Sequence, residues 1–200
     1  MPIQIPFCFF FIKKKDRKLL PVQDYRKLNT ITIKNRYYLP LISKLISKLK
    51  NAKYFTKIDI RWGYNNIHMR EGDEWKAAFR TNRGLFKPLV MFFGLTNSPT
   101  MFQTMINSLF CDLINHGKVV IYMDDIMIFT PDLNKHCKIV TEILQILRDN
   151  KLYPKHTKCE FEQAETKYLG LIVGHQTIKM DPTKVKGVTS WSVPTTRKQL

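Results

Sequence analysis

Two adjacent aspartates, Asp124 and Asp125, interrupt an otherwise apolar and partly β-branched run between Val119 and Phe129. Such a run is typical of two buried strands joined by a tight turn. Burying two like charges side by side is unfavourable, and one carboxylate normally takes up a proton unless a divalent cation lies between them. An Asp-Asp turn exposed to water would give the same pattern, so the pair alone leaves both interpretations open.

A third aspartate, Asp59, ends a strand-like run over residues 54–60 and is expected on the face opposite to Ile58 and Ile60. Three aspartates on neighbouring strands would form a hard oxygen site that suits magnesium better than zinc. Two such ions, about 3.5–4 Å apart, can activate an attacking hydroxyl and stabilise a leaving phosphate oxygen. The spacing does not show that the strands are neighbours, and an isolated strand-end aspartate often serves as a cap or a salt-bridge partner.

Strands and a hairpin that could position these carboxylates follow from periodicity and turn residues. We expect a strand at residues 7–12, a hairpin around residues 81–84 and a strand at residues 167–173. A second strand is expected after Gly174.

Three helices are predicted from apolar spacing and capping residues. One begins at Pro40, and its apolar face consists of Leu41, Ile42, Leu45, Ile46 and Leu49. The next has Ser98 as its N-cap and Pro99 as its first residue, and it runs to about Asn115. The apolar face of the last consists of Leu133, Cys137, Val140, Leu144 and Leu147.

The charge of the chain suits a polyanionic partner. Its 33 Lys and Arg against 16 Asp and Glu give a formal net charge of +17. The basic residues are dispersed along the chain, which favours a groove over a disordered arm. Charge does not distinguish DNA from RNA, and a generic basic surface, as in a ribosomal or chromatin protein, would show the same excess.

The cysteines indicate an intracellular protein. Cys8, Cys111, Cys137 and Cys159 are far apart and show neither a CxxC pair nor a zinc spacing, so we expect reduced, mostly buried thiols. The apolar stretch at residues 7–12 is too short to span a bilayer. Its basic residues follow it, which argues against a secretory signal. We expect no membrane segment and no secretion.

An ordered set of motifs resembles the reverse transcriptases over nearly the whole chain. Tyr122-Met123-Asp124-Asp125 is similar to their YxDD box. The other matching segments follow in the order of the family: residues 12–16, 22–29, 33–42, 57–64, 71–81, 92–99, 151–153, 158–161 and 168–170. Together they resemble the Pol polyprotein of gypsy-type LTR retrotransposons more than a retroviral or non-LTR enzyme.

The resemblance implies an α/β (α+β) fold: the fingers–palm part of a right-hand polymerase, with an antiparallel palm sheet packed on helices. It places fingers, N-terminally incomplete, at residues 1–34 and 67–97, and palm at residues 35–66 and 98–180. A truncated thumb or connection would start at residues 181–200. We therefore expect a fragment of a Pol polyprotein, or a decayed genomic copy, that lacks the family's RNase H and integrase regions.

The function implied is that of an RNA-directed DNA polymerase, which synthesises DNA on an RNA or DNA template by two-metal nucleotidyl transfer. By resemblance, Asp59, Asp124 and Asp125 are catalytic, and together with Ile60 they hold two Mg²⁺ ions, for which Mn²⁺ can substitute. The implied partners are an RNA and DNA template–primer, dNTPs and the rest of the polyprotein. The implied location is a cytoplasmic particle or the nucleus.

The family also implies roles for residues around the carboxylates. The nucleotide-binding residues are expected to be Lys14, Tyr64, Phe93, Gly94, Met123 and Lys158. The template and primer contacts are expected to be Arg26, Tyr122, Tyr168, Leu169 and Gly170. Tyr64 would act as a steric gate against the ribose 2′-hydroxyl, although a packed aromatic fits the same pattern. A plain surface lysine is an alternative for Lys158, and a local ion pair with Asp24 is an alternative for Arg26.

Two residues depart from the family pattern. The family usually carries a glycine where this chain has Arg17, and an arginine where it has Leu20. An arginine held at φ > 0 costs of order 1 kcal/mol in backbone strain. Loss of the arginine contact to the triphosphate costs about 1.5–3 kcal/mol. A catalytically impaired, nucleic-acid-binding remnant is therefore the alternative to an active polymerase. The fingers motifs disfavour a template-independent palm-type transferase or cyclase.

Overall fold

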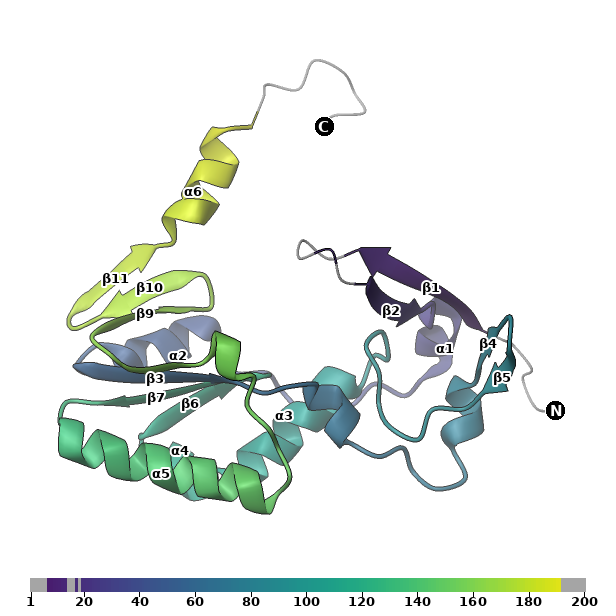
Figure 1. Ribbon diagram of the computed structural model, residues 1–200, viewed down its shortest axis with the longest axis horizontal. Helices are drawn as coiled ribbons and strands as arrows, with labels where there is room; N and C mark the ends of the chain where they lie inside the picture. The colour runs from purple at the N-terminus through teal and green to yellow at the C-terminus, as the bar shows by residue number, and fades with distance from the viewer. Residues whose placement is uncertain (1–6, 14–16, 18, 192–200) are drawn as a thin grey trace.

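A computed structural model of the chain describes residues 7–13, 17 and 19–191. Figure 1 shows two lobes. The larger lobe is built around a four-stranded sheet, and the smaller contains the first two strands and helix α1 (Arg26–Ile31). Helix α3 (Ser98–Leu109) lies between the lobes (Figure 1).

The central sheet is antiparallel, with the strand order β6-β7-β3-β8. Its strands are β3 (Tyr54–Asp59), β6 (Val119–Tyr122), β7 (Asp125–Thr130) and β8 (Glu160–Gln163). β6 and β7 form the expected hairpin, in which Tyr122 pairs with Asp125. The predicted α/β class, with an antiparallel sheet packed on helices, is confirmed.

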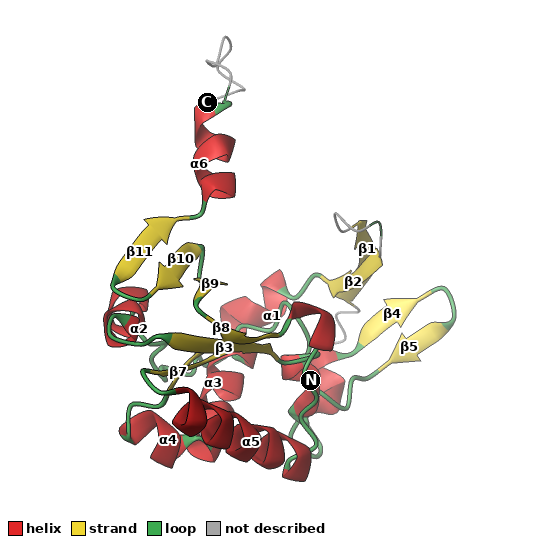
Figure 2. Cartoon of the chain, turned by 60° about the vertical axis from the view of Figure 1, so that its left-hand side comes forward, coloured by secondary structure: helices red, strands yellow, loops and turns green. Residues whose placement is uncertain are grey.

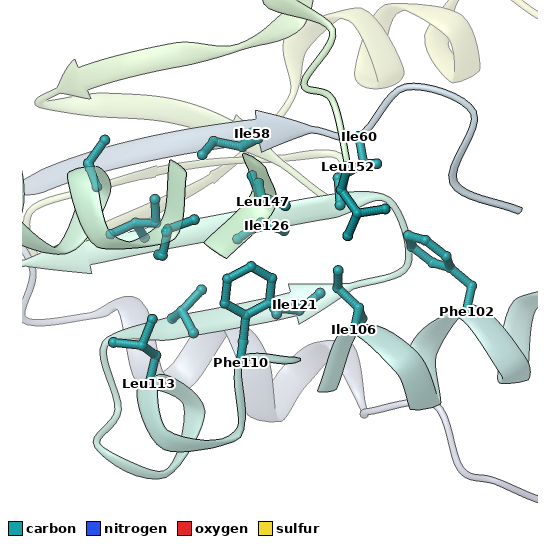
Figure 3. Packing of buried hydrophobic residues seen from close by; sticks show 14 of the residues in the cluster. Ile58, Ile60, Phe102, Ile106, Phe110, Leu113, Ile121, Ile126, Leu147 and Leu152 are labelled. Carbon is teal, nitrogen blue, oxygen red and sulfur yellow. The ribbon is translucent and has the colours of Figure 1, made fainter. Parts of the chain in front are cut away.

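Helices cover one face of this sheet. Ile58, Ile121 and Ile126 are fully or almost fully buried there, against α3, α4 (Cys111–Asn115) and α5 (Leu133–Asp149). Figure 3 shows how their side chains meet those of the helices. Because successive residues of a strand point to opposite faces, the alternate residues must be covered from the other side.

The opposite face is covered by a helix and a small sheet. Phe55, Val120 and Met127 pack there against α2 (Ile42–Leu49) and the C-terminal strands. In α2, Leu45, Ile46 and Leu49 are buried as predicted, and Ile42 is exposed. The predicted start at Pro40 is wrong, because the helix begins at Ile42 after an extended N-cap, the exposed Leu41. The strands β3, β6 and β7 are thus covered on both faces, whereas β8 is exposed.

The smaller lobe contains a second sheet, with the order β2-β1-β4-β5. Its strands are β1 (Phe7–Lys13), β2 (Leu19–Gln23), β4 (Phe79–Thr81) and β5 (Gly84–Phe86), and β1 pairs with β4 in parallel. The strand predicted at residues 7–12 and the hairpin around residues 81–84 are confirmed. The short 3₁₀ segments η1 (Gly63–Asn66) and η2 (Glu74–Ala77) precede this hairpin in the chain.

The strand predicted over residues 167–173 is wrong, because the chain reverses in its middle. Leu169 and Gly170 adopt left-handed conformations (φ 50° and 82°) and join β9 (Glu165–Tyr168) to β10 (Leu171–Gly174). The strand expected after Gly174 is present as β11 (Thr177–Met180). The segment η3 (His156–Lys158) precedes β8, and α6 (Pro182–Thr189) extends away from the sheets (Figure 2).

The helix predicted to run from Ser98 to about Asn115 is interrupted. Phe110, at φ −110°, ends α3 and begins α4. The N-cap is Asn97 rather than Ser98, because the Ser98 hydroxyl donates instead to the Phe92 carbonyl at 2.9 Å. Pro99 lies in the first turn, where its missing N–H leaves no intrahelical bond unmade.

The face predicted for the helix at residues 133–147 is partly wrong. Val140 and Leu147 are buried as expected, but Leu133 and Leu144 are exposed. His136 takes an inward position because its two ring nitrogens lie 2.7 Å from Thr56 Oγ1 and 3.1 Å from Thr130 Oγ1. Burial lowers the pKa of His136, which favours the neutral ring.

The prediction of mostly buried cysteines is also wrong for the thiols that the structure describes. Cys111 is exposed, and Cys137 and Cys159 are half-buried; all three are free thiols. The structure does not describe the side chain of Cys8. No helix in residues 7–13, 17 or 19–191 combines the length and apolar character needed to cross a membrane.

Gln23, at the end of β2, is 3% exposed, and neither atom of its amide has a hydrogen-bond partner among the described residues. A buried unpaired amide costs about 1–3 kcal/mol. We therefore predict that Gln23→Met, which keeps the length of the side chain, raises the free energy of unfolding by about that amount. Urea unfolding followed by circular dichroism measures it.

The exposed Gln145 provides the matched control, since Gln145→Met makes the same change on the surface of α5. Its effect should stay within about 0.5 kcal/mol. A loss of stability in Gln23→Met would show that the amide has a partner in solution.

Candidate active site

Three aspartates occupy neighbouring backbone positions where the strands of the central sheet end. Asp59 and Asp125 form the last residue pair between β3 and β7. Asp124 lies in the turn just before β7, and its main-chain carbonyl accepts a hydrogen bond from Ile60 N at 3.0 Å. The structure therefore brings together the three aspartates that the sequence singled out, and it places Ile60 beside them.

The carboxylates destabilise one another's charge. Burial, and after it the charges of Asp59 and Asp125, raise the pKa of Asp124 to about 6, against the opposing effect of Lys158. Burial also raises the pKa of Asp125, although Lys57 opposes this shift. The Oδ1 atom of Asp124 is buried and has no hydrogen-bond partner in the part of the chain that the structure describes.

Lys158 lies against the first carboxylate. Its Nζ donates a hydrogen bond to Asp59 Oδ2 at 2.9 Å, and this bond raises the pKa of Lys158. The segment before Lys158 is tied to the end of β3, since Lys155 N donates to the Asp59 carbonyl at 2.8 Å and Arg61 N to that of Tyr153 at 2.9 Å. About half of the lysine side chain is exposed, so it can move without disturbing the core.

The donor atoms fit a hard divalent cation such as Mg²⁺. All three side chains offer carboxylate oxygens, and the unpaired Asp124 Oδ1 is an acceptor that a cation would satisfy. Among residues 7–13, 17 and 19–191, no three His, Cys, Asp or Glu side chains form a ready cluster for a metal ion. Asp59 is paired with Lys158, and the like charges of the neighbouring carboxylates repel one another.

The chain passes close to Asp124 in the segment after Asp59. Trp62 adopts a left-handed conformation (φ 52°) and turns the chain into η1. A Cβ added to Gly63 would lie 2.6 Å from Asp124 Oδ1 and 3.0 Å from Phe102 Cζ. Only a residue without a side chain fits between these two groups.

Tyr64 is packed between two phenylalanines. Its ring makes edge-to-face contacts with Phe93 (centroids 4.9 Å apart) and Phe102 (6.0 Å). Burial raises the pKa of Tyr64 to about 12, and the charge of Asp124 contributes to the shift. The packed aromatic considered from the sequence is thus present, and it lies close enough to Asp124 to be affected by its charge.

The predicted nucleotide residues Phe93 and Gly94 lie on the loop before α3. Gly94 has φ 98°, and Asn29 holds the loop by donating to the Gly94 carbonyl (2.7 Å) and accepting from Thr96 N (2.9 Å). Phe93 is partly exposed and reaches Tyr64. This loop is therefore joined to the carboxylate edge through aromatic contacts.

The residues predicted to contact template and primer lie in separate places. Arg26 is exposed and forms a two-pronged ion pair with Asp24, with nitrogen–oxygen distances of 2.6 to 3.1 Å, so the local pair considered from the sequence is present. Tyr168 is fully buried, and the turn that follows it, Leu169 and Gly170, lies at the end of the small C-terminal sheet. Tyr122 is half-buried beneath the carboxylate turn.

The residues between β1 and β2, where the chain departs from the family pattern, are described only in part. Arg17 adopts a left-handed conformation (φ 63°), as expected for a position where the family carries glycine. Lys14 and the side chain of Leu20 lie outside the described residues and side chains.

Sequence reasoning missed Gln103, which contacts the turn directly. Gln103 is fully buried in α3, and its Oε1 accepts a hydrogen bond from Met123 N at 2.8 Å. A signal was present in the sequence. Phe102, Ile106 and Phe110 mark the inward side of the helix, and Gln103 falls on that side, three and seven residues before the last two.

Comparisons with known proteins agree with this geometry. Residues 12–173 match the protein family described as reverse transcriptase (RNA-dependent DNA polymerase). The Transposon Tf2-3 and Tf2-7 polyproteins of Schizosaccharomyces pombe are each 37% identical to this chain over 190 residues. These matches cover 95% of this chain but only 14% of each relative.

Solved structures of foamy viral protease-reverse transcriptase share the fold. One, in complex with an RNA/DNA hybrid, superposes with a TM-score of 0.83, and another, in complex with double-stranded DNA, with 0.87. Each is 21% identical to this chain and covers 98% of it, while the chain covers 26% and 34% of those proteins. The family match spans most of the chain and contains all three carboxylates, so the chain belongs to the reverse transcriptase (RNA-dependent DNA polymerase) family.

Proposed function

We propose that the chain is the polymerase part of a gypsy-type retrotransposon Pol polyprotein and that it synthesises DNA on an RNA or DNA template. The observation that carries the proposal is the meeting of Asp59, Asp124 and Asp125 at one sheet edge, beside Tyr64. The relatives are transposon polyproteins, and the solved structures bind an RNA/DNA hybrid or double-stranded DNA, which supports a template–primer as the partner.

The carboxylates would hold the metal ions that the reaction needs. Asp59 and Asp124, with Asp125 and the main chain of Ile60, would bind two Mg²⁺ ions, or Mn²⁺ in their place. Ions held there would supply Lewis-acid activation of the primer 3′-hydroxyl and would neutralise charge on the α-phosphate and the leaving pyrophosphate. The protein's own contribution is to fix these oxygens on a rigid sheet edge, so that little reorganisation is needed during the reaction.

The nucleotide would lie between the three aspartates and the loop before α3, which carries Phe93 and Gly94. The Tyr64 ring would exclude a ribose 2′-hydroxyl and so favour dNTPs, while Phe93 and Gly94 would line the base and Met123 the sugar. Lys14 would meet the triphosphate. Lys158, released from Asp59 when the cation binds, would be free to face the leaving pyrophosphate.

The template–primer would lie across the two lobes. Residues 1–34 and 67–97 would act as fingers, and residues 35–66 and 98–180 as palm, with residues 181–200 starting a thumb or connection. Arg26 would contact the template strand, and Tyr122 with the Tyr168–Leu169–Gly170 turn would support the primer end. The net charge of +17 supports binding of this polyanion.

A second candidate is the impaired remnant, which binds nucleic acid without synthesis. Arg17 in a left-handed conformation favours it, because this residue carries strain that the family's glycine avoids. The substitution of Leu20 for the family's arginine favours it as well. Salt-dependent duplex binding without synthesis would support this candidate, and restoration of synthesis by Leu20→Arg would assign the defect to that residue.

Primer extension on poly(rA)/oligo(dT) with Mg²⁺ or Mn²⁺ tests the main proposal. We predict that the chain extends the primer and that Asp124→Asn lowers the rate by about 10²–10³-fold, because one metal ligand loses its charge. Asp112→Asn removes the same charge from an exposed position of α4 and should leave the rate unchanged. Equal rates in both variants would contradict the assignment of Asp124.

We further predict that Gly63→Ala lowers primer extension by about 10²-fold, because the added methyl group pushes Asp124 out of position. Gly187→Ala is the control, since an added Cβ at Gly187 meets nothing within 4 Å. Full activity of Gly63→Ala, measured with the same primer and template, would show that the turn tolerates displacement.

The raised pKa of Asp124 also predicts how stability depends on pH. Its folded pKa of about 6 exceeds the ordinary value of 3.8, so its contribution to the stability of the metal-free protein is present below the lower value and is lost as the pH rises through the higher one. Asp124→Asn should therefore stabilise the metal-free protein more at about pH 7 than at about pH 4. Thermal unfolding of both proteins across this range measures the difference.

Added Mg²⁺ should raise the melting temperature of the wild-type chain at about pH 7 and lose that effect below about pH 6, because protons and the cation compete for Asp124. The matched control for loss of one carboxylate is Asp112→Asn. A Mg²⁺ effect that is independent of pH and persists in Asp124→Asn would contradict the proposed metal site.

A further inference from the structure

The turn that carries Asp124 is strained. Met123 links β6 to the aspartates with φ 56°, in the left-handed region that a residue with a Cβ enters only at a cost of about 1–2 kcal/mol. Such a conformation persists when neighbouring contacts fix it. The pairing of β6 with β7 ends at Tyr122 and Asp125, so the sheet ladder does not reach the turn residue.

A side chain from another element supplies the missing contact. The Met123 N–H donates to Gln103 Oε1 at 2.8 Å, and Gln103 is fully buried. If this acceptor were removed, a half-buried N–H would lose its partner. The same helix also supports the other side of the site, because Phe102 lies against Gly63 and Tyr64.

The orientation of the glutamine amide is locked by further hydrogen bonds. Gln103 Nε2 donates to Asn107 Oδ1 at 2.9 Å and lies 3.4 Å from the Ile121 carbonyl. Asn107 Nδ2 in turn donates to the hydroxyl of Tyr37 at 2.8 Å. If the Gln103 amide were reversed, its NH₂ group would face the Met123 N–H, donor against donor. The chain of bonds therefore presents an oxygen to the turn.

We propose that Gln103 is a positioning residue for the reaction: by binding the Met123 N–H, it fixes the turn and with it the place of Asp124 relative to Asp59. The inference rests on the proposed polymerase function for its catalytic consequence. The hydrogen bond itself, which ties α3 to the turn that carries Asp124, does not depend on that function. Gln103 itself lies beneath the turn and does not act on the substrate.

Two substitutions separate the hydrogen bond from packing. Gln103→Met keeps the length of the side chain and removes the acceptor. Gln103→Glu keeps an acceptor oxygen for the Met123 N–H but cannot donate to Asn107. Gln145→Met, in the exposed part of α5, makes the same chemical change away from the site.

The first readout is amide hydrogen exchange, which needs no activity. We expect Gln103→Met to abolish the protection of the Met123 amide and to preserve that of Phe129, whose N–H donates to the Lys118 carbonyl at the far end of the hairpin. Gln103→Glu should retain part of the Met123 protection. Unchanged protection in Gln103→Met would overturn the tether, whether or not the chain is a polymerase.

The second readout is single-nucleotide incorporation. Gln103→Met should lower the maximal rate by about tenfold to a hundredfold, with little change in the affinity for primer–template and no change in Gln145→Met. Gln103→Glu should recover part of the rate. Loss of the tether with a wild-type rate would overturn the positioning role. If the wild-type chain incorporates no nucleotide, the polymerase function fails, and the exchange experiment alone decides the tether.

Discussion

The mutual repulsion of three carboxylates at one edge of a buried sheet is the constraint on which the rest of the structure depends. Asp59 and Asp125 face each other as the last pair of two strands, and Asp124 precedes Asp125 in the turn. Left alone, such a cluster would drive the strands apart or take up a proton, and the raised pKa of Asp124 shows the second tendency. The ammonium group of Lys158 offsets part of the charge.

The apolar cores on the two faces of the central sheet offset the cost of placing these charges together. Each strand of the central hairpin alternates its side chains between a helical face and a face covered by α2 and the C-terminal strands. The apolar area buried on both sides stabilises the sheet far more than three partly buried charges destabilise it. The fully exposed alternative, an Asp-Asp turn in water, would need no such support. The site is therefore placed beside the two apolar cores.

Sequence reasoning found the parts that depend on strand alternation and residue type. The central hairpin, the third aspartate and the first strand follow from apolar runs interrupted by charge. The inward face of α5 did not follow, because His136 is drawn inward by Thr56 and Thr130, and hydrogen bonds between distant residues leave no periodic signal. The turn at Leu169 was missed because leucine is not a usual residue for a left-handed conformation.

Gln103 shows a different limit within the site, because its spacing from Ile106 and Phe110 marks the inward side while its residue type argues against burial. A polar residue in an amphipathic helix is normally assigned to the exposed face, since burying an amide without partners is unfavourable. Gln103 is buried because its partners come from a strand turn twenty residues later and from its own helix, four residues on.

Apolar packing of the sheet and the hydrogen bond from Met123 to Gln103 contribute in different ways to the position of the aspartates. Hydrophobic packing is non-directional, so it fixes the strands but leaves the turn between them free to shift. A hydrogen bond to a single main-chain N–H is directional, and it acts on the turn residue next to Asp124. A site that must hold several oxygens around a cation needs both, because charge placed about 1 Å away from its position loses most of its effect on the reaction. The helix that contributes Phe102 and Gln103 at consecutive positions meets both requirements at once, since one residue packs against Gly63 and the next binds the turn.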